Sequence, residues 1–150
     1  MKRQIYTFLS VFVVILVIDQ AIKYFFVSTN YQLNGEYISL VLAYNTGVAF
    51  SMFAFLAENL KFVQLALIFV LFGYLLYEKK LLKSNLINFA MIFGSGISNI
   101  LDRFTYGAVV DYVFWHKWFE FAIFNFADVM INISVFLIIM KNFIKKEKDE

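Results

Sequence analysis

The stretch that decides the fold is residues 6–27, YTFLSVFVVILVIDQAIKYFFV, an apolar run interrupted near its end by Asp19 and Lys23. A helix needs roughly 20 predominantly apolar residues to cross the hydrocarbon core of a bilayer. The run is too long for the apolar part of a cleaved signal peptide, and no small-residue cleavage site follows it. We therefore expect a retained membrane-spanning helix here.

The composition of the whole chain also indicates a membrane protein. Of the 150 residues, 62% are hydrophobic, whereas an ordinary soluble domain is nearer half apolar. A soluble core of this length cannot bury so much apolar surface, so lipid must cover part of it. Three further apolar stretches, at about 60–77, 86–101 and 124–140, predict an all-α membrane protein with four transmembrane helices in one domain over residues 1–150.

The residue types that the chain lacks narrow its chemistry. It contains no Cys and a single His, which excludes a thiol nucleophile and disfavours both a His-based metal site and a Ser-His-Asp triad. We therefore expect no metal and no cofactor. The net charge of +2 does not indicate a nucleic-acid partner.

Basic residues are distributed unevenly among the segments that join the spans, and most of the 13 Lys and Arg fall on one side. The positive-inside rule places that side, with both termini, in the cytoplasm. The residues on this side are Lys2, Arg3, Lys79, Lys80, Lys83, Lys141, Lys145, Lys146 and Lys148.

Two longer segments, 28–59 and 102–123, then face outward. The first contains Asn34-Gly35 between strand-like residues, which is a strong signal for a two-residue β-hairpin. The second is rich in aromatic residues between Trp115 and Phe121, a pattern typical of an amphipathic segment lying on lipid headgroups. We therefore expect a small extracytoplasmic β element and an amphipathic outer segment.

Several polar side chains lie at a similar depth within the predicted spans. Counted at 1.5 Å per residue from the flanking basic residues, Asp19, Asn99 and Asp128 all reach the outer part of the membrane. Ionisable residues inside spans are costly and mark function by default. Asp19 and Lys23, however, are spaced i and i+4, and we expect them to form a structural ion pair.

Asp111 and Asp128 differ from the other aspartates because neither has a basic residue within four positions, whereas Asp19 has Lys23 and Asp102 has Arg103. Two carboxylates held close together cannot both ionise easily, so the pair shares a proton. One can then take a proton from water while the other donates to a carbonyl oxygen, as in aspartic proteases. That the two aspartates are close in space is a hypothesis at this point.

Three other interpretations of the polar residues stay open. A transporter or channel would also use intramembrane carboxylates, but it should place them along a path to both faces. In a scaffold protein, the aspartates could be replaced without loss of function. A Ser-Lys protease would need Lys23 beside Ser28 or Ser51. His116, between aromatic residues, is interpreted as an interfacial polar residue.

Five motifs, in order across residues 19–128, resemble those of the signal peptidase II family, the lipoprotein signal peptidases. They are Asp19-Gln20-Ala21-Ile22-Lys23, Asn45-Thr46-Gly47-Val48-Ala49-Phe50-Ser51, Asn99-Ile100-Leu101-Asp102-Arg103, Gly107-Ala108-Val109-Val110-Asp111-Tyr112 and Phe124-Asn125-Phe126-Ala127-Asp128.

The resemblance implies that Asp111 and Asp128 are the catalytic pair of an aspartic endopeptidase that globomycin inhibits. Its substrate would be a prolipoprotein that carries diacylglycerol on a cysteine. A monomeric enzyme of the bacterial inner membrane, in contact with membrane lipid, would cleave it just before that cysteine. Residues 28–59 would form a β-cradle, and 102–123 would include a mobile lid. The resemblance further implies supporting or substrate-binding roles for Asn45, Gly47, Asn99, Asp102, Arg103, Asn125 and Ala127.

The sequence departs from the family pattern at three positions. Ser95 and Ser98 replace glycines that are common in the third span, and Ala122 stands where a proline often precedes the last motif. These departures concern helix packing and the lid geometry, and they leave both aspartates in place.

The charge asymmetry makes a topological prediction. A reporter fused after Glu150 should be active only if it works in the cytoplasm, because the basic residues keep that end inside. The same reporter fused after Tyr31 should be inactive. Activity of a periplasm-dependent reporter at Glu150 would contradict the predicted orientation.

Overall fold

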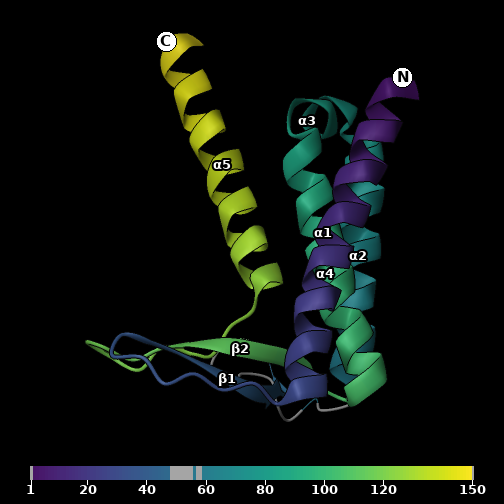
Figure 1. Cartoon of the computed structure of the whole chain (residues 1–150). Helices are drawn as coiled ribbons and strands as arrows, with labels where there is room; N and C mark the ends of the chain where they lie inside the picture. Colours follow the sequence, from purple (N-terminus) through teal and green to yellow (C-terminus); the bar gives the residue numbers. More distant parts are fainter. Residues whose placement is uncertain (1, 48–55, 57–58, 150) are drawn as a thin grey trace.

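The computed structural model describes residues 2–47, 56 and 59–149, with side chains described to residue 144. Helices run roughly alongside one another, and two strands lie at the end of the bundle opposite both termini (Figure 1). The elements in chain order are α1 (Lys2–Thr29), β1 (Ile38–Asn45), α2 (Leu60–Tyr77), α3 (Lys79–Ser84), α4 (Leu86–Tyr106), β2 (Val109–Trp115) and α5 (Phe126–Asp149).

Among the described residues, three helices are long and apolar enough to cross a membrane. They are α1, α2 and the Phe126–Ile144 part of α5, with mean hydropathies of 2.2, 2.0 and 1.7. Only 11% of each apolar window is buried inside the protein, so these helices present most of their apolar surface outward. That distribution suits helices whose solvent is lipid.

Helix α4 contains the predicted stretch 86–101 and extends it to Tyr106. It is not among the three apolar helices because small and polar side chains, including Ser95 and Ser98, line it. It is instead the most enclosed helix and packs against α1, α2 and α5. Its C-terminal end contains Asp102 and Arg103, so the predicted outer segment 102–123 begins inside a helix.

Close packing of α1 on α4 depends on Gly94. A Cβ atom at this position would lie 2.8 Å from the carbonyl oxygen of Phe12 and 3.3 Å from the Ile15 Cβ. Small residues allow membrane helices to approach in this way. One residue before Gly94, Phe93 of α4 packs edge-on against Phe72 of α2, with ring centroids 5.7 Å apart.

The sheet takes one strand from each outer segment. Strand β1 pairs antiparallel with β2, and Ala43 lies opposite Asp111 and Asn45 opposite Val109. Residues two apart on a strand share a face, so Asn45 and Asp111 lie on the same side of the sheet. The sequence predicted the β element in residues 28–59 but not its partner strand.

The predicted two-residue hairpin at Asn34-Gly35 is wrong. Leu33 and Leu40 pair instead, through backbone hydrogen bonds of 3.0 and 2.8 Å, so a wider turn separates them. Neither Asn34 nor Gly35 has the positive φ that a type I′ turn requires. Glycine is needed at 35 for a different reason, because a Cβ there would clash with the Ile38 carbonyl oxygen.

Gly94→Ala should lower the apparent melting temperature in detergent, because the added methyl group would force α1 and α4 apart. Overpacking of this kind costs about 1–3 kcal/mol. Gly73→Ala in α2 is the matched control, since a Cβ added at Gly73 would meet no atom within 4 Å. The control should be neutral or stabilising, because Ala is favoured over Gly in helices. Equal effects would refute the close contact at Gly94.

Candidate active site

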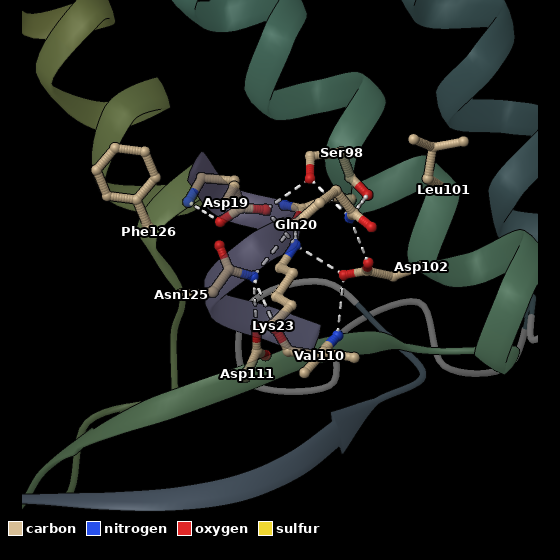
Figure 2. A network of polar contacts seen from close by, with 12 residues as sticks. Asp19, Gln20, Lys23, Ser98, Leu101, Asp102, Val110, Asp111, Asn125 and Phe126 are labelled. Carbon is tan, nitrogen blue, oxygen red and sulfur yellow. Dashed lines mark hydrogen bonds and ion pairs between the residues drawn. The ribbon is translucent and has the colours of Figure 1, made fainter. Parts of the chain in front are cut away.

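A buried ion cluster joins α1 to α4 at the end of the bundle near the sheet (Figure 2). The Lys23 Nζ lies 2.7 Å from Oδ2 of Asp19 and 2.7 Å from Oδ2 of Asp102. All three residues are at most 1% exposed. The predicted i, i+4 pair of Asp19 and Lys23 is thus present, and Asp102 enlarges it to a triad.

The two carboxylates of this triad also hold the backbone of the elements around them. The Asp19 Oδ1 accepts a hydrogen bond of 2.9 Å from the backbone N–H of Ala127, at the start of α5. The Asp102 Oδ2 accepts one of 3.2 Å from the backbone N–H of Val110 in β2. The ion cluster therefore positions the start of α5 and the strand that carries Asp111.

Ser98, one of the departures from the family pattern, belongs to this network. Its hydroxyl donates to the Asp19 Oδ2 at 2.6 Å and lies 2.8 Å from the Gln20 Nε2. The Gln20 amide also donates to the Asp102 Oδ1 at 2.8 Å. Serine at 98 thus supports the contact between α1 and α4. The buried Ser95 hydroxyl, by contrast, has no hydrogen-bond partner among the described residues.

Asp111 lies on β2 and is only 2% exposed. Its Oδ2 accepts a hydrogen bond of 3.1 Å from the Asn45 side chain, and its Oδ1 accepts one of 2.7 Å from Asn125. Burial, together with the nearby charge of Asp128, raises the pKa of Asp111 to about 7 against the opposing effect of the two amides. This carboxyl group therefore titrates near neutral pH.

Asp128 lies in the first turn of α5, where amide groups surround its carboxylate. Its Oδ1 accepts a hydrogen bond of 3.0 Å from the Asn99 side chain. Its Oδ2 accepts one of 3.2 Å from the Asn125 backbone, and the Asp128 N–H donates back to the Asn125 Oδ1 at 2.9 Å. Asn125 thus contacts both aspartates and holds them in a fixed relation.

Both aspartates line one cavity of about 240 Å³. Arg103 also lines it, and its guanidinium donates to the carbonyl oxygens of Thr46 and Gly47. These contacts hold the chain beyond β1 against α4. The remaining lining residues are Asn45, Gly47, Gln64, Asn99, Val109, Phe121, Ala122, Ile123, Phe124, Ile131 and Asn132.

The structure brings the predicted site residues together from segments far apart in the sequence. Ala127 is not among the residues that line this cavity, and it contributes its buried backbone N–H to the site. Residues 48–51 of the second motif lie outside the described residues. His116 is elsewhere, with its Nε2 2.9 Å from the Ser39 hydroxyl. In the part of the chain that the structure describes, no three His, Cys, Asp or Glu side chains group as metal ligands would.

Sequence reasoning missed Gln64, which lines the cavity. The sequence does point to Gln64, because it is a polar residue within the largely apolar run 60–77.

The Ser-Lys protease alternative with Ser28 is contradicted. Lys23 contacts carboxylates, and the exposed Ser28 hydroxyl donates to the Phe25 carbonyl oxygen. Ser51 lies outside the described residues.

Asp19→Asn should lower the melting temperature strongly while leaving the rate per folded molecule largely intact. Removing one partner of a buried ion pair typically costs about 3–5 kcal/mol. Glu36→Gln is the control, because Glu36 pairs with Lys117 with its side chain 70% exposed, and exposed pairs contribute at most about 1 kcal/mol. An inactive but stably folded Asp19→Asn protein would show that Asp19 acts in the chemistry.

Comparison with known proteins identifies the family of the chain. The family model described as signal peptidase (SPase) II matches residues 11–144. A lipoprotein signal peptidase of Campylobacter jejuni subsp. jejuni serotype O:6 is 53% identical over 146 residues, which cover 97% of this chain and 93% of the relative. One from Helicobacter pylori strain ATCC 700392 / 26695 is 46% identical over 147 residues, which cover 98% and 93%.

The fold is also found in solved structures. A bacterial membrane enzyme determined by the in meso method superposes with a TM-score of 0.79, at 20% identity, and the match covers 97% of this chain and 92% of the other. At that identity the likeness concerns the fold alone. Because the family model and the curated relatives span nearly the whole chain, the chain belongs to the signal peptidase II family, the lipoprotein signal peptidases.

Proposed function

We propose that this chain is a membrane aspartic endopeptidase that removes signal peptides from lipoproteins, with Asp111 and Asp128 as its catalytic pair. The observation that carries the proposal is that both carboxylates line one cavity and that Asn125 contacts both. Family membership supports the reaction. The geometry supports the choice of these two aspartates.

In the proposed mechanism the pair carries one proton near neutral pH. The ionised carboxylate takes a proton from water as the water oxygen attacks the scissile carbonyl carbon. The protonated carboxyl group donates to the carbonyl oxygen. Collapse of the resulting diol breaks the C–N bond, and the leaving nitrogen takes up a proton from the pair. Asn45 and Asn125 would keep the Asp111 carboxyl group oriented throughout.

The proposed substrate is a prolipoprotein that carries diacylglycerol on the cysteine after the cleaved bond. In this arrangement α4 is the third of four membrane spans, both termini are cytoplasmic and the site faces the outer surface of the inner membrane. The end of the bundle that holds β2, the strand of Asp111, is opposite both termini, which fits this placement (Figure 1). Apolar lining residues such as Phe121 and Ile131 would contact the lipid-bearing part of the substrate.

Asp111→Asn and Asp128→Asn should each lower cleavage of lipidated substrate by about 10²–10⁴-fold, the usual contribution of general acid–base catalysis. The double variant should be scarcely slower than either single one, because the two roles depend on each other. Glu120→Gln, an exposed carboxylate outside the cavity, is the control. Near-wild-type cleavage by either folded single variant would remove the pair from the mechanism.

The rate should follow a bell-shaped pH profile whose alkaline limb falls near pH 7, where Asp111 loses its proton. Its pKa is raised on folding, so the folded state binds more protons than the unfolded state between about pH 4 and pH 7. The contribution of Asp111 to stability is therefore lost as pH rises through that window. Melting curves should show this decline in the wild type and less of it in Asp111→Asn. A rate that keeps rising well above pH 7 would contradict a protonated Asp111.

EDTA should leave cleavage unchanged, and globomycin should block it.

A further inference from the structure

Two adjacent cavities lie at the end of the bundle that carries both termini, opposite Asp111 and Asp128. Here α3 forms a short bridge between α2 and α4 (Figure 1). The first cavity, the polar pocket, measures about 380 Å³ and is lined by Thr7, Lys83, Ser84, Asn85, Leu86, Ile87, Asn88 and Lys141. The second, the apolar groove, measures about 320 Å³ and is lined by Gln4, Ile5, Phe8, Leu9, Phe72, Leu76, Lys79, Leu82, Lys83 and Leu86.

The apolar groove is open to the surroundings of the protein. Its walls come from α1 and α2, and Ile5, Leu9 and Leu76 are 53%, 51% and 49% exposed. Leu82 of α3 lines the groove as well, and Lys83 and Leu86 line both cavities. Within a membrane such a groove has the dimensions and chemistry to hold part of an acyl chain rather than water.

Positive charge gathers where the two cavities meet. Lys83 lines both, Lys79 lies at the groove and Lys141 of α5 lines the polar pocket, and no acidic side chain lines either cavity among the described residues. The Lys141 ammonium donates to the Ser84 carbonyl oxygen, which holds it against α3. An ammonium has three protons, so Lys141 retains donors for an anion in the polar pocket.

Asn85 supplies a second and independent feature. It is only 3% exposed, and its Nδ2 donates to the Leu81 carbonyl at 3.3 Å and to the Ser84 hydroxyl at 2.9 Å. Its buried Oδ1 has no hydrogen-bond partner among the described residues. A buried acceptor without a donor is costly, and a phosphate cannot supply that donor, whereas a hydroxyl group can.

We propose that this end of the bundle binds one phospholipid whose headgroup combines an anionic phosphate with a hydroxyl group, as in phosphatidylglycerol. The phosphate lies between Lys83 and Lys141, a glycerol hydroxyl donates to the Asn85 Oδ1, and an acyl chain occupies the apolar groove. The inference rests on the membrane arrangement proposed above, but on none of the catalytic assignments. The bound lipid joins α5 to α3, at the end where α5 diverges from the other helices in Figure 1.

The test uses the full-length protein, purified in detergent, stripped of lipid and titrated with defined phospholipids. Native mass spectrometry counts bound lipid, and melting curves report its effect. Phosphatidylglycerol should bind with a stoichiometry of one and raise the melting temperature. Phosphatidylethanolamine, which is neutral overall, and phosphatidylmethanol, which keeps the charge but lacks the hydroxyl groups, should each bind at least about fivefold more weakly, since headgroup charge and a buried hydrogen bond both contribute to affinity.

Variants locate the site. Lys83→Gln combined with Lys141→Gln should weaken phosphatidylglycerol binding by about tenfold or more, from the loss of two cations near the phosphate. Lys2→Gln combined with Lys80→Gln removes the same charge from residues that line neither cavity and should change binding less than about twofold, because these cations are not at the phosphate. Leu76→Trp should block the groove and weaken binding of every two-chain lipid.

Equal binding of the three lipids would overturn the proposal, and so would unchanged affinity in the Lys83/Lys141 variant or an equal loss in the Lys2/Lys80 control. Asp111→Asn should bind phosphatidylglycerol like the wild type. If Asp111→Asn loses cleavage but still binds the lipid, the result bears on the catalytic pair and leaves the lipid site unaffected. Normal cleavage without selective lipid binding would refute the lipid site alone.

Discussion

The charge of Lys23, buried between two carboxylates, is the constraint on which the rest of the site depends. Its ammonium has three protons and lies 2.7 Å from each of three acceptors, on Asp19, Asp102 and Asn99. Each acceptor makes a further contact in the site. Asp19 holds the start of α5, Asp102 holds β2, and Asn99 reaches Asp128 in the first turn of α5. A single buried cation thus ties α1 and α4 to α5 and β2.

The same arrangement determines why Asp111 and Asp128 are left with amide partners. Lys23 forms ion pairs with Asp19 and Asp102, and Arg103 donates to backbone carbonyls rather than to a carboxylate. Among the described residues, neither Asp111 nor Asp128 forms an ion pair. Amides can orient a carboxyl group in either protonation state, whereas a salt bridge would hold it ionised. Amide partners of this kind are compatible with a pair that carries one proton, as the proposed chemistry requires.

The sequence predicted those features that local patterns determine. Long apolar runs located α1, α2 and α5, and the spacing of Asp19 and Lys23 predicted their pair. The pairing of β1 with β2 could not be predicted, because it joins segments about 70 residues apart and no local periodicity reports such a contact. The Asn34-Gly35 signal failed for a related reason, since the pairing of β1 with β2 outweighs the local turn preference. The role of Ser98 depends on its distance to Asp19, which only the fold supplies.

The bulge in β1 has a consequence for how such enzymes diversify. Two residues of β1, Val41 and Leu42, lie opposite the single residue Tyr112, and a bulge of this kind allows the two halves of a strand to differ in twist and direction. The half next to Asp111 must keep its register, because a slip of one residue would turn the carboxyl group to the other face. The half beyond the bulge carries no such restriction. Insertions and substitutions in the outer half of the sheet can therefore accumulate without turning the Asp111 carboxyl group to the other face.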